Sequence, residues 1–352
     1  MNINYRQLTF AREYRSLSQT ELAKRIKGLS QSNLSKYEKG LDTLSSDILD
    51  LIIAELNFPK KFFKKRISNE VENAHYRKRA TMLKSDRTKI EYGNKLIGHI
   101  IDELSDSIEW PIYQLVPLNL EDGYTPEKSA EFIRKRLQVL PGEPMVNINY
   151  LLEKAGIVIV QVDSHEKFDG VSFISDLSTP VIILNRRMDN DRKRFTLAHE
   201  LGHIIMHFDF PVSDYRDKEN EANRFASEFL MPQRYIKQSL FNLRPSGLGA
   251  LKQYWLTSKA SIIRRAKDLE CIDSNRYTYL NIELSRNGEK KKEKGEVFID
   301  NPKLFLKAID LHKNDLSYSL NDMAEAFSLP LDVINKYCKL QRPDKGKLRV
   351  VI

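Results

Sequence analysis

The sequence predicts an α+β protein with several domains, and three observations carry this prediction. Capped helical patterns fill residues 1–66, and helical spacing returns at 303–340. Between them, three short β-branched runs within 157–184 indicate a small sheet. A chain of 352 residues is long enough to bury two or three separate cores. We therefore expect four parts: an all-helical domain at 1–66, a helical connector at 67–120, an α+β domain at 121–285, and a basic hairpin with a helical tail at 286–352.

Composition excludes several classes of protein. Hydrophobic residues make up 41% of the chain and charged residues 30%, which is ordinary for a globular protein and too apolar for disorder. The longest apolar runs are only a few residues and the first residues lack an apolar signal core, so we expect a cytoplasmic protein with no membrane partner. Two cysteines, Cys271 and Cys338, are too few for a disulfide framework or a thiolate metal cluster.

The chain is basic, and its charge is unevenly distributed. Lysine and arginine number 57 against 48 aspartates and glutamates, a formal charge of +9. Residues 1–66 contain 13 of the basic and 7 of the acidic side chains, and therefore hold six of the nine excess charges. A small module with this imbalance is suited to bind a polyanion such as nucleic acid.

The helices of the first domain are marked by their caps. Apolar side chains spaced by threes predict a helix over 4–15. Ser18 and Glu21 have the spacing of a capping box and open a short second helix. Ser30 is placed to cap a third helix over 31–39, and two more helical patterns complete the domain.

The second and third helices, joined by a tight turn, match a helix-turn-helix. The outward positions of the third helix carry amide, hydroxyl and amine groups with no apolar member, and amide side chains pair well with adenine edges in a major groove. The candidate DNA contacts are Gln19, Gln31, Ser32, Asn33, Ser35 and Lys36. The polar residues alone are equally compatible with a helical bundle that has a polar outer face.

A resemblance favours DNA binding. The segment LSQTELAKRIKGLSQSNLSKYEKG resembles the helix-turn-helix of the XRE (Cro-type repressor) family, and the resemblance covers residues 4–66. One extra residue at the turn, within 26–29, departs from the family pattern just before Gln31. The resemblance implies that this domain binds a double-stranded DNA operator.

The middle of the chain changes from helices to strands. An apolar stripe through 92–104 predicts a helix in the connector, and a second helical pattern covers 128–137. Strands are predicted at 157–162, 171–174 and 180–184, where β-branched residues follow one another.

A helical segment after the strands contains the HExxH pattern, formed by His199, Glu200 and His203. Residues four apart share one helix face, so both imidazoles can bind one Zn²⁺ while Glu200 lies beside the open coordination position. The bare pattern also arises by chance, so a third ligand is needed. His207 is excluded as that ligand because eight residues from His199 correspond to about 12 Å along the axis.

Glu219 is the predicted third ligand. It lies next to the apolar stripe of the following helix, and a carboxylate beside a buried face costs several kcal/mol unless it has a partner. Glu221 and Glu228 point further from that stripe and are predicted to face solvent. Asn223, one turn after Glu219, is placed to hold a ligand histidine by an outer hydrogen bond.

Two histidines and one glutamate form the thermolysin-like ligand set, with a fourth position open for water. Zinc would acidify that water and polarise a carbonyl, and Glu200 would take the proton and return it to the leaving amine. The strand at 171–174 is placed to pair with an extended peptide. A structural metal site or an inactive relic stays open as an alternative, as does manganese in place of zinc.

The segments RFTLAHELGHIIMH and ENEANRFASEFLMP resemble the ImmA/IrrE family of metallopeptidases in motif and spacing, over roughly 145–285. The resemblance implies a zinc-dependent, site-specific protease that cleaves a transcriptional repressor, in some members in response to single-stranded DNA. By motif match, His199, His203 and Glu219 carry over as metal ligands and Glu200 as the base.

Beyond this region, Tyr277–Ser285 and Gly295–Ile299 are predicted to form a β-hairpin whose charged tip spans 289–294. The lysines of this tip are either solvated or in contact with nucleic acid. Residues 303–340 are helical, with 319–338 forming either a helical hairpin or a second helix-turn-helix.

Three functions remain open. The leading one is a protease that cuts a repressor, directed to an operator by its own DNA-binding domain. The alternative is a DNA-binding regulator or antitoxin whose peptidase-like domain binds or senses a partner without cleaving it. The third, self-cleavage between the domains, needs an accessible connector, and the basic stretch 67–95 is the candidate. A homodimer is compatible with each.

Overall fold

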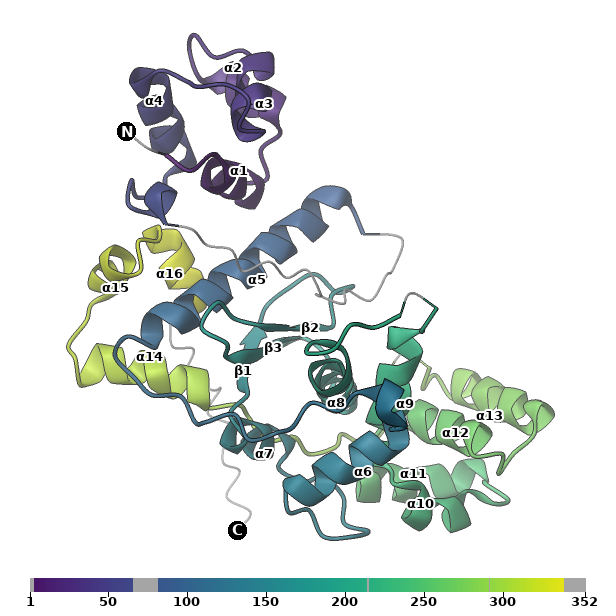
Figure 1. Cartoon of the computed structure of the whole chain (residues 1–352). Coiled ribbons are helices and arrows are strands. Elements are labelled where there is room, and N and C mark those ends of the chain that lie inside the picture. The colour runs from purple at the N-terminus through teal and green to yellow at the C-terminus, as the bar shows by residue number, and fades with distance from the viewer. Residues whose placement is uncertain (1–2, 66–81, 214, 291, 339–352) are drawn as a thin grey trace, which may run out of the picture. The chain divides into compact units, whose positions relative to one another are not determined.

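The computed structural model describes residues 3–65, 82–213, 215–290 and 292–338, and its helices and strands are shown in Figure 1. The chain divides into two compact units. The N-terminal unit contains the described residues of 1–69, Met82–Glu109 and the tail from Leu304, and the central unit contains Trp110–Lys303. The predicted α+β fold, with a helical first domain, a central domain around a small sheet and a helical tail, is confirmed.

The N-terminal unit begins with five short helices, as the sequence predicted. They are α1 (Tyr5–Tyr14), α2 (Gln19–Arg25), α3 (Gln31–Glu38), α4 (Ser46–Leu56) and the 3₁₀ turn η1 (Phe62–Lys64). The predicted capping box is present, because the Ser18 hydroxyl accepts from Glu21 N and the Glu21 carboxylate accepts from Ser18 N. Leu8, Leu22 and Leu34, one from each of the first three helices, are fully buried and hold these helices together.

The rest of the N-terminal unit comes from distant parts of the chain: α5 (Lys84–Leu104), α14 (Leu304–Asn314), α15 (Leu320–Ala326) and α16 (Leu331–Cys338). The apolar stripe predicted at 92–104 is the buried face of α5. His99 of α5 bonds the carbonyl of Phe327 at 2.9 Å, and Arg15, just after the end of α1, donates to both oxygens of Asp332 at 2.5 and 3.1 Å. The tail therefore packs against helices that lie more than 200 residues earlier in the chain.

In the central unit, the described strands form one three-stranded sheet of order β1-β3-β2. Its strands are β1 (Val158–Val162), β2 (Gly170–Ile174) and β3 (Pro180–Asn185). β1 pairs with β3 in parallel and β2 pairs with β3 antiparallel, so β2 is an edge strand of this sheet. The three predicted strands are thus confirmed, and β3, buried along its whole length, is the central one.

The helices of the central unit form its core together with this sheet. In chain order they are η2 (Leu120–Asp122), α6 (Pro126–Arg136), α7 (Ile148–Lys154), α8 (Asn190–His207), α9 (Lys218–Leu230), α10 (Gln233–Leu240), η3 (Pro245–Gly247), α11 (Leu248–Trp255), α12 (Lys259–Asp268) and α13 (Ser274–Arg286). α7 and α8 pack against the strands, and Figure 1 shows α8 directly beside them. α8 packs against β2 and β3 on one side and α9 on another. No described helix is long and apolar enough to cross a membrane.

A glycine permits the close crossing of α8 and α9. A Cβ at Gly202 would lie 3.1 Å from the ring of Phe225, closer than side chains normally approach. The first turn of α9 is consequently held near the middle of α8, where the HExxH residues lie.

The predicted β-hairpin is wrong. Residues 274–286 form α13, because Asp273 caps it by accepting from Arg276 N at 2.7 Å, and Leu280 and Leu284 bury one helical face. Gly288, with φ of +70°, follows the end of this helix instead of turning a hairpin. Within the predicted connector for self-cleavage, 67–95, residues 84–95 form the first part of α5, and residues 66–81 lie outside the described part of the chain.

Candidate functional site

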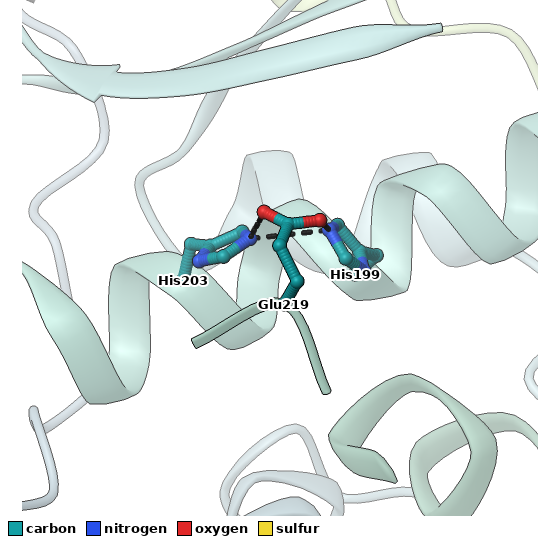
Figure 2. Close-up of side chains that lie close together, drawn as sticks. All are labelled: His199, His203 and Glu219. Carbon is teal, nitrogen blue, oxygen red and sulfur yellow. Dashed lines mark hydrogen bonds and ion pairs between the residues drawn. The ribbon is translucent and has the colours of Figure 1, made fainter. Parts of the chain in front are cut away.

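Helix α8 carries both histidines of the HExxH pattern on one face. His199 and His203 are buried, and their Nε2 atoms face each other at 3.1 Å (Figure 2). Two nitrogens that each bind a tetrahedral zinc ion at 2.0–2.1 Å lie about 3.3 Å apart. The spacing of the two imidazoles therefore fits a shared Zn²⁺.

Glu219, in the first turn of α9, completes the donor set. Its two carboxylate oxygens lie 3.5 Å from His199 Nε2 and 3.3 Å from His203 Nε2, and one donor atom from each residue lies within 4.8 Å of the others. Burial raises the pKa of Glu219, but its contacts with the two imidazoles outweigh this effect and hold the pKa well below its usual range. Two neutral nitrogens and one charged oxygen suit zinc, so the residues present fit the metal that the sequence predicts.

The outward nitrogen of each histidine has its own partner. His199 Nδ1 lies 3.1 Å from Asn223 Oδ1, the contact predicted from the helix spacing. His203 Nδ1 lies 2.9 Å from His207 Nδ1, and His207 Nε2 lies 3.0 Å from a carboxylate oxygen of Glu221. His207 is thus not one of the three donors but lies directly behind one of them, His203.

Glu200, between the two histidines in sequence, is also buried. The hydroxyl of Ser172, on the edge strand β2, donates to Glu200 Oε2 at 2.7 Å. Sequence reasoning missed Ser172, although a serine within the apolar strand segment Val-Ser-Phe-Ile was a visible signal. A fully buried hydroxyl needs a hydrogen-bond partner, and here the partner is the candidate catalytic carboxylate.

The predictions that Glu221 and Glu228 face solvent are wrong. The Glu221 side chain is 12% exposed and accepts from Arg216 at 2.7 Å as well as from His207. Glu228 is only 1% exposed, because α12 covers its side of α9 and contributes Arg265 as an ionic partner. The predicted orientation of these two residues assumes a single buried face, whereas α9 is covered on more than one.

A cleft of about 880 Å³ is lined by Asn223, the hydrogen-bond partner of His199, and by none of the three donor residues themselves. Its walls come from α8, α9, α12 and the segment after α13, and they include Asn223, Phe195 and Arg224. Many of its charged side chains are paired. The bidentate pair of Arg224 and Glu127, at 2.8 Å for both contacts, is one example.

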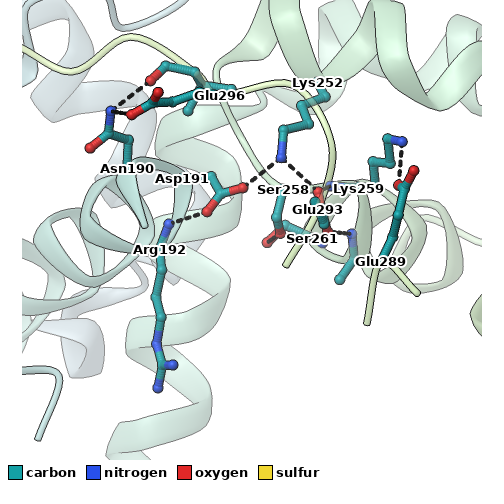
Figure 3. Close-up of polar contacts among 12 residues, drawn as sticks. Asn190, Asp191, Arg192, Lys252, Ser258, Lys259, Ser261, Glu289, Glu293 and Glu296 are labelled. Carbon is teal, nitrogen blue, oxygen red and sulfur yellow. Dashed lines mark hydrogen bonds and ion pairs between the residues drawn. The ribbon is translucent and has the colours of Figure 1, made fainter. Parts of the chain in front are cut away.

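The acidic residues of the predicted hairpin tip anchor this wall (Figure 3). Glu293 accepts from the backbone N–H groups of Lys259 and Ala260 at the start of α12, and also from the buried ammonium of Lys252 at 2.9 Å. Lys252 donates to Asp191 at 2.8 Å as well. The segment is consequently fixed through its glutamates, while Lys290, Lys292 and Lys294 stay exposed.

The predicted DNA-contact residues lie at two depths. Gln31, Ser32, Asn33 and Lys36 are exposed on α3, and Ser35 is partly exposed. Gln19 is half-buried and held in place: its amide donates to Glu38 at 2.7 Å and its carbonyl accepts from Gln31 at 2.9 Å. Arg12 of α1 pairs with both oxygens of Glu38, at 2.6 and 2.8 Å, and so fixes the base of this network.

Comparisons with known families agree with the two resemblances. Residues 152–267 match the model of the IrrE N-terminal-like domain, a peptidase family, and residues 10–63 match a helix-turn-helix family model. The first match includes α8 and α9 with the three-donor cluster, and the second includes α2 and α3. No curated protein and no solved structure matches the chain.

Proposed function

Because the chain joins an XRE-type helix-turn-helix domain to an IrrE-like metallopeptidase-type domain, we propose that this DNA-binding regulator is a zinc-dependent endopeptidase that cleaves a repressor or another protein partner. The helix-turn-helix would bind double-stranded operator DNA through Gln31, Asn33 and Lys36. The observation that carries the proposal is the convergence of His199, His203 and Glu219 beside a buried Glu200.

In this proposal His199, His203 and Glu219 hold the ion. Zinc in such a site supplies a Lewis acid that polarises a carbonyl and acidifies a water molecule. Glu200 takes the proton of the attacking water and later delivers it to the leaving nitrogen. Its buried carboxylate is oriented by the hydroxyl of Ser172, which donates to Oε2.

The edge strand β2 would align the substrate. Its partner in the sheet is β3 on one side, so its other backbone edge can pair with an extended peptide. Ser172 on this strand reaches Glu200, which brings the proposed substrate edge close to the catalytic carboxylate. An extended, accessible segment of a partner protein is therefore the substrate class we propose.

The test is proteolysis of repressor-like proteins encoded next to this gene, with zinc content measured on the same samples. We expect wild type to cut one of them, with or without single-stranded DNA as an activator, and Glu200→Gln to lose cleavage while retaining zinc. Glu131→Gln, an exposed glutamate in the same unit, is the matched control and should cleave normally.

Two outcomes would redirect the proposal. A zinc-loaded wild type that cuts no partner under either condition would favour the regulator or antitoxin whose peptidase-like domain binds without cleaving. Fragmentation of the chain itself, at a rate that does not fall when the protein is diluted, would favour self-cleavage in cis.

A further inference from the structure

A hydrogen-bonded chain leads away from His203 into the protein. His203 Nδ1 lies 2.9 Å from His207 Nδ1, and His207 Nε2 lies 3.0 Å from Glu221 Oε2. Arg216 donates to the other oxygen of Glu221 at 2.7 Å and to Glu121 at 3.0 Å. The His207 side chain is fully buried, and those of Glu221 and Arg216 are 12% and 16% exposed, so the chain is largely shielded from water.

The direction of each hydrogen bond from His203 to Glu221 follows from the ion pair of Glu221 with Arg216 at the end of the chain. Glu221, fixed by the Arg216 cation, is an acceptor only, so His207 must donate to it through Nε2–H. A neutral His207 with its proton on Nε2 presents a lone pair on Nδ1. The contact with His203 then requires that His203 carry its proton on Nδ1, which leaves the Nε2 lone pair of His203 pointing toward His199 and Glu219.

From this geometry we propose that His207, Glu221 and Arg216 are positioning residues that fix the tautomer and the ring orientation of His203 for metal binding. The proposal rests on the proposed function in one respect only, that a metal binds at the three-donor cluster. The Glu221 carboxylate, paired with Arg216, accepts from His207 and thereby makes Nε2 of His203 a stronger metal ligand.

The two histidines are therefore supported unequally. His199 has a neutral amide behind it, since its Nδ1 meets Asn223 Oδ1 at 3.1 Å. His203 has a buried imidazole and an ion pair behind it. Both Glu219 and Glu221 lie in the first turn of α9. This one turn therefore supplies a candidate metal ligand, Glu219, and the carboxylate that holds His207 behind His203, Glu221.

Zinc affinity tests the proposal directly. His207→Leu removes both hydrogen bonds and should weaken zinc binding by roughly 10- to 100-fold in competition with a chromophoric chelator. His207→Asn keeps an acceptor, Oδ1, at the position of Nδ1 and should recover most of the affinity. The matched control is His312→Leu: His312 is equally buried, bonds the carbonyl of Ala308 in its own helix, and lies in the other unit.

Two spectroscopic readouts separate positioning from a general loss of stability. The visible absorption bands of the Co²⁺-substituted protein should shift in His207→Leu and return in His207→Asn. In protein labelled with ¹⁵N at its seven histidines, two-bond ¹H–¹⁵N spectra should show His207 protonated at Nε2 and His203 at Nδ1. Signals of His207 are identified by their absence in His207→Asn.

The failure of this proposal is distinguishable from that of the proposed function. Wild-type zinc affinity and an unchanged cobalt spectrum in His207→Leu would overturn the positioning role, as would a His207 protonated at Nδ1. A wild type that binds zinc and cuts no protein would refute the proteolytic function and leave the tautomer assignment supported by the nitrogen spectra.

Discussion

Breaking the buried ion pair between α9 and α12 should destabilise the central unit strongly. Arg265 and Glu228 are 4% and 1% exposed, so their contact belongs with buried pairs and not with surface pairs worth less than about 1 kcal/mol. Removing one partner of such a pair typically costs about 3–5 kcal/mol because the other charge stays buried. In Arg265→Met, Glu228 keeps one hydrogen bond, from Gln233 N at 2.9 Å, so we expect about 3 kcal/mol, at the lower end of that range.

Tryptophan fluorescence is a suitable assay because both tryptophans, Trp110 and Trp255, lie in the central unit. For a unit of this size, a loss of about 3 kcal/mol corresponds to a melting temperature lowered by roughly 6–12 °C. Burial raises the pKa of Glu228 even with Arg265 beside it, so without the arginine this carboxyl should take up a proton more readily.

The double variant Glu228→Gln/Arg265→Met decides whether the cost comes from an uncompensated charge. Without either charge, the protein should be more stable than Arg265→Met alone, giving a coupling energy of about 2 kcal/mol. Additive effects of the two single substitutions, or a cost below about 1 kcal/mol for Arg265→Met, would refute the reasoning.

Three further predictions concern DNA, pH and thiol chemistry. Lys36→Ala should weaken binding to all duplexes and lower the salt dependence of binding by about one ion, whereas Gln31→Ala should cost about 1–3 kcal/mol of binding free energy on the preferred operator alone. Fluorescence anisotropy at several salt concentrations measures both effects. Equal losses on every sequence for Gln31→Ala would contradict a base contact. Burial raises the pKa of Glu127, but hydrogen bonds from Arg224 outweigh this effect and lower the pKa. The pair therefore stabilises the fold above the ordinary carboxyl pKa of about 4, and this stabilisation is lost as the pH falls through the lowered pKa. Urea unfolding of Arg224→Gln should therefore show a deficit at pH 7 that shrinks below pH 4, and a constant deficit would count against the linkage. Burial raises the pKa of the Cys338 thiol to about 12, so at pH 8 this thiol should resist a disulfide reagent until denaturant is added, and rapid modification of the native protein would show that α16 is not packed as described.

Features that depend on neighbouring residues were predictable from the sequence. Ser18 caps α2 because its partner Glu21 is three residues away, and the three strands follow from their β-branched runs. The convergence of His199 and His203 requires only a helix with 3.6 residues per turn. Glu219 could be selected as a third donor because helical spacing alone places it beside the apolar stripe of α9.

Features that depend on distant segments were not predictable in this way. Glu228 was assigned to solvent because nothing in the local pattern of α9 reveals that α12, more than 30 residues later, covers that face with Arg265. The strand predicted at 277–285 is part of α13, which begins where Asp273 caps it. The apolar pattern of 277–285 alone does not distinguish a short amphipathic helix from a strand.

The supports of the candidate metal site show the same division. Local spacing determines which side chains of α8 and α9 point the same way, and this was enough to select the three candidate donors and Asn223. Ser172 reaches Glu200 from a strand 28 residues earlier, and Arg216 reaches Glu221 from a loop whose path no periodicity describes. Sequence patterns thus determine the identity and spacing of the donor groups, while the partners that orient and charge them depend on how helices and strands pack, because burial is a property of the assembled core.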